Sequence, residues 1–115
     1  ELAVNTFNSF YKTYSELMNE KQEPMINLVS FYEEEYGWRV IIFLRAKHRP
    51  SVFSAEDETK MLVSPAAIDL GGVCVFPRED DFNRITKGMI ANIFKEVFVD
   101  EEILKELLNK FKQSL

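Results

Sequence analysis

The chain has 115 residues, of which 46% are hydrophobic and 29% charged, so it predicts one soluble globular domain with a single core. Its formal net charge of −5 argues against general binding to nucleic acid or to a membrane surface, since both need a basic field. No apolar run approaches the roughly 20 residues of a membrane span, and the first residues lack a signal-peptide pattern. The single cysteine, Cys74, cannot form an internal disulfide, which favours a reducing, cytoplasmic setting.

The first predicted element is an amphipathic helix over residues 2–20, ended by the segment 21–24. Its apolar side chains recur at helical spacing: Ala3, Phe7, Phe10, Tyr14, Leu17 and Met18. Three of its rings, Phe7, Phe10 and Tyr14, are also candidates for a face that docks on a partner. Because the chain begins at Glu1 rather than Met, we expect it to be a piece of a longer protein.

Two runs rich in β-formers, 25–33 and 38–45, predict a β-hairpin, in which Gly37 supplies the positive φ of the connection. Alternation places Trp38, Val40, Ile42 and Leu44 on one side of the second strand. Both sides of this strand are largely apolar, so we expect a central strand that is covered on both faces.

Residues 46–60 predict a polar connection, with the acidic run 56–58 on the surface. Two further strands are expected at 60–64 and 71–76, the second with Cys74 packed in the core as a small hydrophobe. Thr86 and Asp100 then predict the N-caps of two C-terminal helices. The expected fold class is α+β: an antiparallel sheet with a central hairpin, packed by N-terminal and C-terminal helices.

The chemistry concentrates in the basic loop that follows the strongest strand. The candidate ligands for a phosphate are Arg45, Lys47, His48, Arg49 and Ser51. Arginine binds phosphate bidentately, lysine acts as a mobile point charge, and a serine hydroxyl adds a hydrogen bond. Ser64 is a further candidate for such a hydroxyl donor. A solvated basic turn that binds nothing is the alternative.

No complete catalytic constellation is present. His48 is the only histidine, so neither a paired nucleophile nor a multi-ligand metal site is expected from it, and we predict no metal and no cofactor. The carboxylates of Glu79, Asp80 and Asp81 are expected to form either an acidic surface turn or the start of a helix, with metal-assisted hydrolysis as a weaker possibility.

Two ordered blocks carry a family resemblance: Trp-Arg-Val-Ile-Ile-Phe-Leu-Arg at 38–45 and Ser-Pro-Ala-Ala-Ile-Asp-Leu-Gly-Gly at 64–72. Their succession resembles the C-terminal part of the diadenosine tetraphosphate phosphorylases and GDP-galactose phosphorylases. These enzymes belong to the histidine-triad and galactose-1-phosphate uridylyltransferase superfamily, and a group of uncharacterised bacterial proteins shows a still closer pattern. The superfamily's His-x-His-x-His or His-x-His-x-Gln nucleophile motif is absent from a chain with one histidine.

The resemblance implies a histidine-triad-like fold and a domain that binds a nucleotide or sugar phosphate, while catalysis is supplied elsewhere. The implied partner is the N-terminal catalytic half of the parent protein, or a second copy of the chain. By itself the chain is not expected to be catalytic. The alternative function is a non-enzymatic dimerisation or interaction domain, whose helices and sheet edge mediate assembly.

Overall fold

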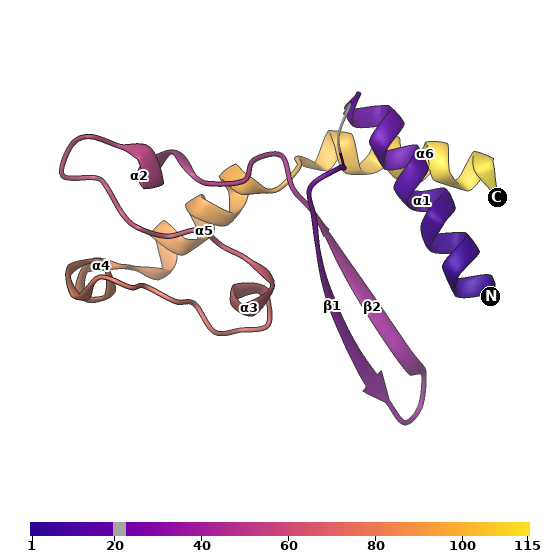
Figure 1. The fold of residues 1–115 in the computed structure, drawn as a ribbon, viewed down its shortest axis with the longest axis horizontal. Helices are drawn as coiled ribbons and strands as arrows, with labels where there is room; N and C mark the ends of the chain where they lie inside the picture. Colours follow the sequence, from indigo (N-terminus) through magenta and orange to yellow (C-terminus); the bar gives the residue numbers. More distant parts are fainter. Residues whose placement is uncertain (20–22) are drawn as a thin grey trace. The chain divides into compact units, whose positions relative to one another are not determined.

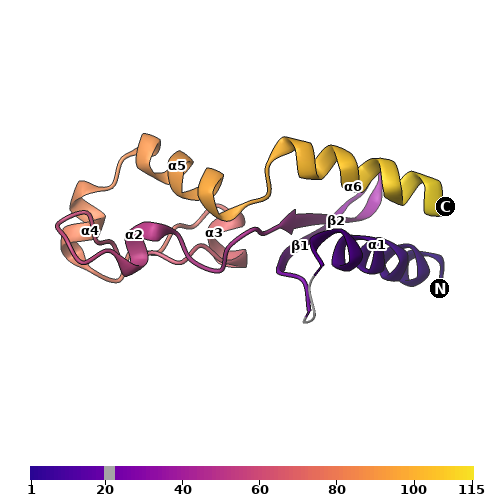
Figure 2. The same cartoon turned by 90° about the horizontal axis from the view of Figure 1, so that it is seen from above.

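The computed structural model describes residues 1–19 and 23–115. The chain divides into two compact units, each treated separately below (Figures 1 and 2). The helical unit consists of Glu1–Pro24 and Val99–Leu115, and the hairpin unit is Met25–Phe98. None of the helices in these described stretches is both long and apolar enough to cross a bilayer.

The helical unit pairs the first helix of the chain with the last. Helix α1 spans Leu2–Met18 and helix α6 spans Glu101–Ser114, and the two pack together. Phe10 meets Phe111 edge-on, with 5.4 Å between the ring centroids. Asp100 caps α6 as predicted, because its carboxylate accepts a hydrogen bond from the backbone N–H of Ile103 at 2.9 Å. The predicted end of the first helix, at residues 20–22, lies outside the described residues.

The predicted docking face on α1 is largely used within the chain. Tyr14 is fully buried, Phe7 is half-buried, and Phe10 is occupied by its contact with Phe111. Tyr14 therefore packs as a core side chain, whereas Phe7 and Phe10 keep part of their surface exposed.

The hairpin unit begins with two antiparallel strands that lie side by side (Figure 1). Strand β1 spans Ile26–Glu33 and strand β2 spans Gly37–Leu44, in a register that runs from Ile26 opposite Leu44 to Glu33 opposite Gly37. Gly37 has a φ of 74°, which confirms its role in the turn. Helices and an antiparallel hairpin confirm the α+β fold class.

The prediction that β2 is a central, covered strand is wrong. Across the described ranges the sheet has two strands, so β2 forms one of its edges. Trp38 is 73% exposed and Val40 is 57% exposed. An apolar pattern on both faces is typical of a strand that is covered on both sides, but in the described residues Trp38 and Val40 stay exposed.

The predictions of two further strands, at 60–64 and 71–76, are also wrong. Neither segment has a ladder partner among the residues that the structure places, and a strand is stabilised by its neighbour rather than by its own alternation. In the first segment the N–H of Val63 donates to the carbonyl of Met61, which turns the backbone locally. In the second, Cys74 is exposed rather than packed in the core, because its extended segment lacks a neighbouring strand.

The rest of the hairpin unit is helical and irregular. Helices α2 (Ser51–Ser54) and α3 (Ala67–Leu70) are short and were not predicted, whereas α5 (Lys87–Val97) was. The short helix α4 (Glu79–Arg84) begins at the acidic run, for which a helix start was one of the two expectations. Thr86 caps α5 as expected, accepting from the N–H of Met89 at 3.2 Å. Met61, Val63 and Ile93 form the buried core. The half-buried residues around it are Val52, Phe76, Ile85, Met89 and Phe94.

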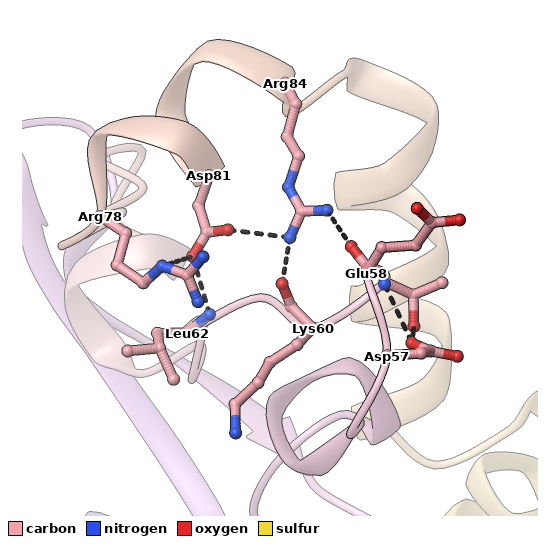
Figure 3. A network of polar contacts seen from close by, with 8 residues as sticks. Asp57, Glu58, Lys60, Leu62, Arg78, Asp81 and Arg84 are labelled. Atoms are coloured by element: carbon pink, nitrogen blue, oxygen red, sulfur yellow. Dashed lines mark hydrogen bonds and ion pairs between the residues drawn. The ribbon is translucent and has the colours of Figure 1, made fainter.

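A buried carboxylate joins α4 to the segment that carries the core residues Met61 and Val63 (Figure 3). Asp81 is fully buried and accepts from the N–H of Leu62 at 2.9 Å and from Nη2 of Arg84 at 2.9 Å, with Nε of Arg78 at 3.7 Å. The prediction of an acidic surface turn is therefore wrong for Asp81, although Asp80 is exposed. The sequence pattern missed this because the partner N–H is 19 residues away.

Candidate functional site

The basic loop is organised around a buried arginine. Arg45 is only 6% exposed, and its guanidinium is surrounded by protein oxygens. Nε donates to the carbonyl of Lys47 at 3.2 Å, and Nη2 donates to the carbonyl of His48 at 2.6 Å. Nη1 donates to Oδ1 of Asn27 at 2.9 Å and to the carbonyl of Pro65. Arg45 was predicted as a direct phosphate ligand. In the structure these donors point inward instead, and they hold the backbone carbonyls of the loop.

The remaining basic side chains of the loop are exposed to solvent. Because Arg45 holds the backbone carbonyls of Lys47 and His48 inward, the side chains of Lys47, His48 and Arg49 are exposed. The guanidinium of Arg49 lies over the ring of Phe53 at 4.0 Å from its centroid. The loop therefore places three basic side chains on one surface segment.

Glu96, on α5, is a member of the site that sequence reasoning missed. Its Oε1 accepts from Nζ of Lys47 at 2.9 Å and from the N–H of Ser51 at 3.0 Å, and its Oε2 accepts from Oγ of Ser51 at 3.1 Å. The bond from Lys47 lowers the pKa of Glu96, burial opposes this, and the bonds from Ser51 lower it further. No local signal marks Glu96, since its partners lie 45 residues or more away in the chain.

Two cavities adjoin α2, and they separate the predicted hydroxyl donors. A cavity of about 270 Å³ is lined by Ser51, Val52, Met61, Met89, Asn92, Ile93 and Glu96. A second cavity, of about 340 Å³, is lined by Phe53, Leu62, Ser64, Asp69, Val75 and Pro77. The structure therefore brings Lys47 and Ser51 together through Glu96. It places Ser64 at the other cavity, which Phe53 also lines.

The second sequence block, at 64–72, folds as a turn and a short helix held by one carboxylate. Oδ2 of Asp69 accepts from the N–H of Ala66 at 2.8 Å, and Oδ1 accepts from the N–H of Val75 at 3.2 Å. Gly72 has a φ of 105°, a conformation open to glycine, where the chain leaves α3. Since Pro65 accepts from Arg45, the block is also tied to the basic loop.

The acidic run at 79–81 does not assemble a metal site. Asp81 is bonded to Leu62 and Arg84, and within the described ranges no group of three or more histidine, cysteine, aspartate or glutamate side chains is placed to hold a metal ion. These residues therefore offer no ligand set for metal-assisted hydrolysis.

Fold and loop together define an α+β module in which a β-hairpin leads into a basic loop ordered by a buried arginine. The chain belongs to the family described as GDPGP1-like, C-terminal domain, which matches residues 4–115. This match confirms the resemblance to the C-terminal domain of GDP-galactose phosphorylase-like proteins. No curated protein and no solved structure gives a significant match to the chain.

Proposed function

We propose that this domain binds the phosphate of a nucleotide or sugar phosphate at the loop 45–51, in a protein whose catalytic histidine motif lies outside this chain. The observation that carries the proposal is the buried guanidinium of Arg45. By bonding the carbonyls of Lys47 and His48, it turns the side chains of Lys47, His48 and Arg49 outward on an otherwise acidic domain. A preordered loop loses little conformational entropy on binding, which favours affinity.

Glu96 supports the proposal by showing where an oxyanion fits. Three donors, Nζ of Lys47 and the N–H and Oγ of Ser51, already converge on its carboxylate. A phosphate offers more acceptor oxygens and more charge to the same donors, and it gains Arg49 and His48 at the loop surface. In this proposal the ligand displaces Glu96 from Lys47.

Replacing Lys47 with alanine is expected to weaken phosphate binding about tenfold or more, because a charge-assisted bond to phosphate contributes roughly 1.5–3 kcal/mol. The measurement is isothermal titration of the chain with GDP, ATP and inorganic phosphate at low and moderate salt. Arg49→Ala is expected to behave alike. Lys95→Ala, an exposed lysine on α5, is the matched control and should leave affinity unchanged. Equal affinity in all variants would remove the loop from the site.

Replacing Glu96 with glutamine is expected to strengthen phosphate binding about tenfold. The substitution keeps the side-chain shape and one acceptor oxygen but removes the charge that competes for Lys47, and unit charges about 4 Å apart near a protein surface interact by a few kcal/mol. The same titration measures it, with Glu102→Gln on α6 as the control. Weaker binding by Glu96→Gln would mean that the carboxylate is a ligand-binding group rather than a competitor.

A further inference from the structure

We propose that a ligand bound at the basic loop releases the C-terminal end of the hairpin unit, which leads directly into the helical unit. The release rests on the proposed function, because there the ligand takes the place of Glu96 on Lys47 and Ser51. The hairpin unit ends at Phe98, and the chain continues through Val99 towards α6. Occupancy of the loop therefore changes the residues at which the chain passes from one unit to the other.

Both ends of the hairpin unit are bonded to the start of the basic loop. At the N-terminal end, the N–H of Arg45 donates to the carbonyl of Met25 at 2.9 Å. At the C-terminal end, the carbonyl of Val97 accepts from the N–H of Ala46 at 2.8 Å and from the N–H of Lys47 at 3.2 Å. The first three residues of the loop thus hold the points at which the chain enters and leaves this unit.

The last turn of α5 is held by a side chain as well as by these backbone bonds. Glu96 lies in that turn, and three donors of the loop converge on its carboxylate. They are Nζ of Lys47 at 2.9 Å, the N–H of Ser51 at 3.0 Å and Oγ of Ser51 at 3.1 Å. Hydrogen bonds to an ionised acceptor are stronger than neutral ones. Directly after this turn, the N–H of Phe98 donates to the carbonyl of Phe94 at 3.1 Å and closes the helix.

The two ends of the unit differ in what the ligand takes from them. The bond between Arg45 and Met25 uses no group that the phosphate is proposed to contact, and the guanidinium of Arg45 remains bonded to loop carbonyls. At the other end, Glu96 loses its three bonds to the loop. A helix end with fewer bonds opens locally more often, and its amide hydrogens exchange faster. The ligand thus loosens the C-terminal end and leaves the N-terminal end closed.

The ring of Phe98 limits the size of this effect. Its centroid lies 5.7 Å from that of Phe94 and 5.9 Å from that of Phe43. These contacts do not involve the loop, so they persist when Glu96 is displaced. The release is therefore a more frequent local opening of the last turn of α5 rather than unfolding of the helix.

Amide hydrogen exchange of the full chain, resolved residue by residue by nuclear magnetic resonance, tests the release. The reporters are the N–H groups of Ala46 and Phe98, and the N–H of Arg45 is the reference for the N-terminal end. With saturating GDP or inorganic phosphate at constant ionic strength, we expect the reporters to exchange about tenfold faster, which corresponds to about 1.4 kcal/mol. The reference should exchange as it does without ligand.

Replacing Glu96 with alanine imitates the released state without a ligand. The variant removes all three bonds at once, so Ala46 and Phe98 should exchange about as fast as in the ligand-bound parent chain. Added GDP should accelerate them no further. Lys95→Ala, at an exposed neighbour in the same turn, is the matched control and should leave both amides as in the parent.

The outcomes distinguish failure of the release from failure of phosphate binding. If GDP binds in the titration but the exchange of Phe98 is unchanged or slower, the release is wrong and phosphate binding stands. Parent-like exchange in Glu96→Ala, or equal acceleration at Arg45, would also contradict a release confined to one end. If neither GDP nor inorganic phosphate binds to the chain, both proposals are wrong.

Discussion

Replacing Arg45 with methionine is expected to lower the free energy of unfolding by about 3–5 kcal/mol, because several buried hydrogen bonds from one charged donor group are lost together and each contributes about 1.5–3 kcal/mol. Methionine fills similar space but leaves the inward-facing carbonyls of Lys47, His48 and Pro65 without their donors. Unpaired buried acceptors cost about 1–3 kcal/mol each before relaxation. Urea denaturation followed by far-ultraviolet circular dichroism measures the change.

The control for this variant is Arg49→Met. Arg49 is exposed and lies over Phe53, so its loss should cost less than about 1 kcal/mol. Arg45→Lys should fall between the two, because an ammonium retains the charge but lacks the fork that reaches several acceptors at once. Similar losses for Arg45→Met and Arg49→Met would show that the buried guanidinium does not organise the loop.

Replacing Asp81 with alanine is expected to cost a similar 3–5 kcal/mol at neutral pH, because Arg84 and the N–H of Leu62 lose a fully buried acceptor. Burial alone would raise the pKa of Asp81, but the bonds from Leu62 and Arg84 and the charge of Arg78 outweigh it and lower the pKa. A carboxylate with a lowered pKa stabilises the fold above its unfolded pKa of about 3.9. That contribution is lost as the pH falls through the lower, folded value.

Urea denaturation repeated from pH 7 to pH 2 separates this contribution from the rest. Stability of the parent chain should fall on acidification, and Asp81→Asn should start lower and fall less steeply. Asp80→Asn, at the exposed neighbour, should reproduce the parent curve. An unchanged pH dependence in Asp81→Asn would mean that other carboxylates govern acid unfolding.

Local patterns predicted the elements whose determinants lie close together in sequence. The positive φ of Gly37, the cap at Thr86 and the cap at Asp100 each involve neighbours within a few residues, and all three were confirmed. Strand alternation also predicted both members of the hairpin. It failed at 60–64 and 71–76 because alternation shows only that the side chains suit a strand, whereas a strand also needs a neighbouring strand with which to pair.

The candidate site was predicted in composition but not in arrangement. The basic residues of the loop could be read directly, whereas their directions depend on Asn27, Pro65 and Glu96, which meet the loop only in the folded chain. A guanidinium in a basic run gives no sign of whether it faces a ligand or the protein. The inward direction of Arg45 and the outward direction of Lys47 follow from these distant acceptors.

The pairing of α1 with α6 has a consequence for the order in which the chain assembles. The two helices stand at opposite ends of the sequence, and the whole hairpin unit is inserted between them. Bringing the ends of an unfolded loop together lowers the entropy of the chain, and the free-energy cost grows by about 0.6 kcal/mol for each doubling of loop length. A hairpin unit that has already folded shortens this loop before the helices meet. The less costly route therefore folds the hairpin unit first and pairs α1 with α6 last.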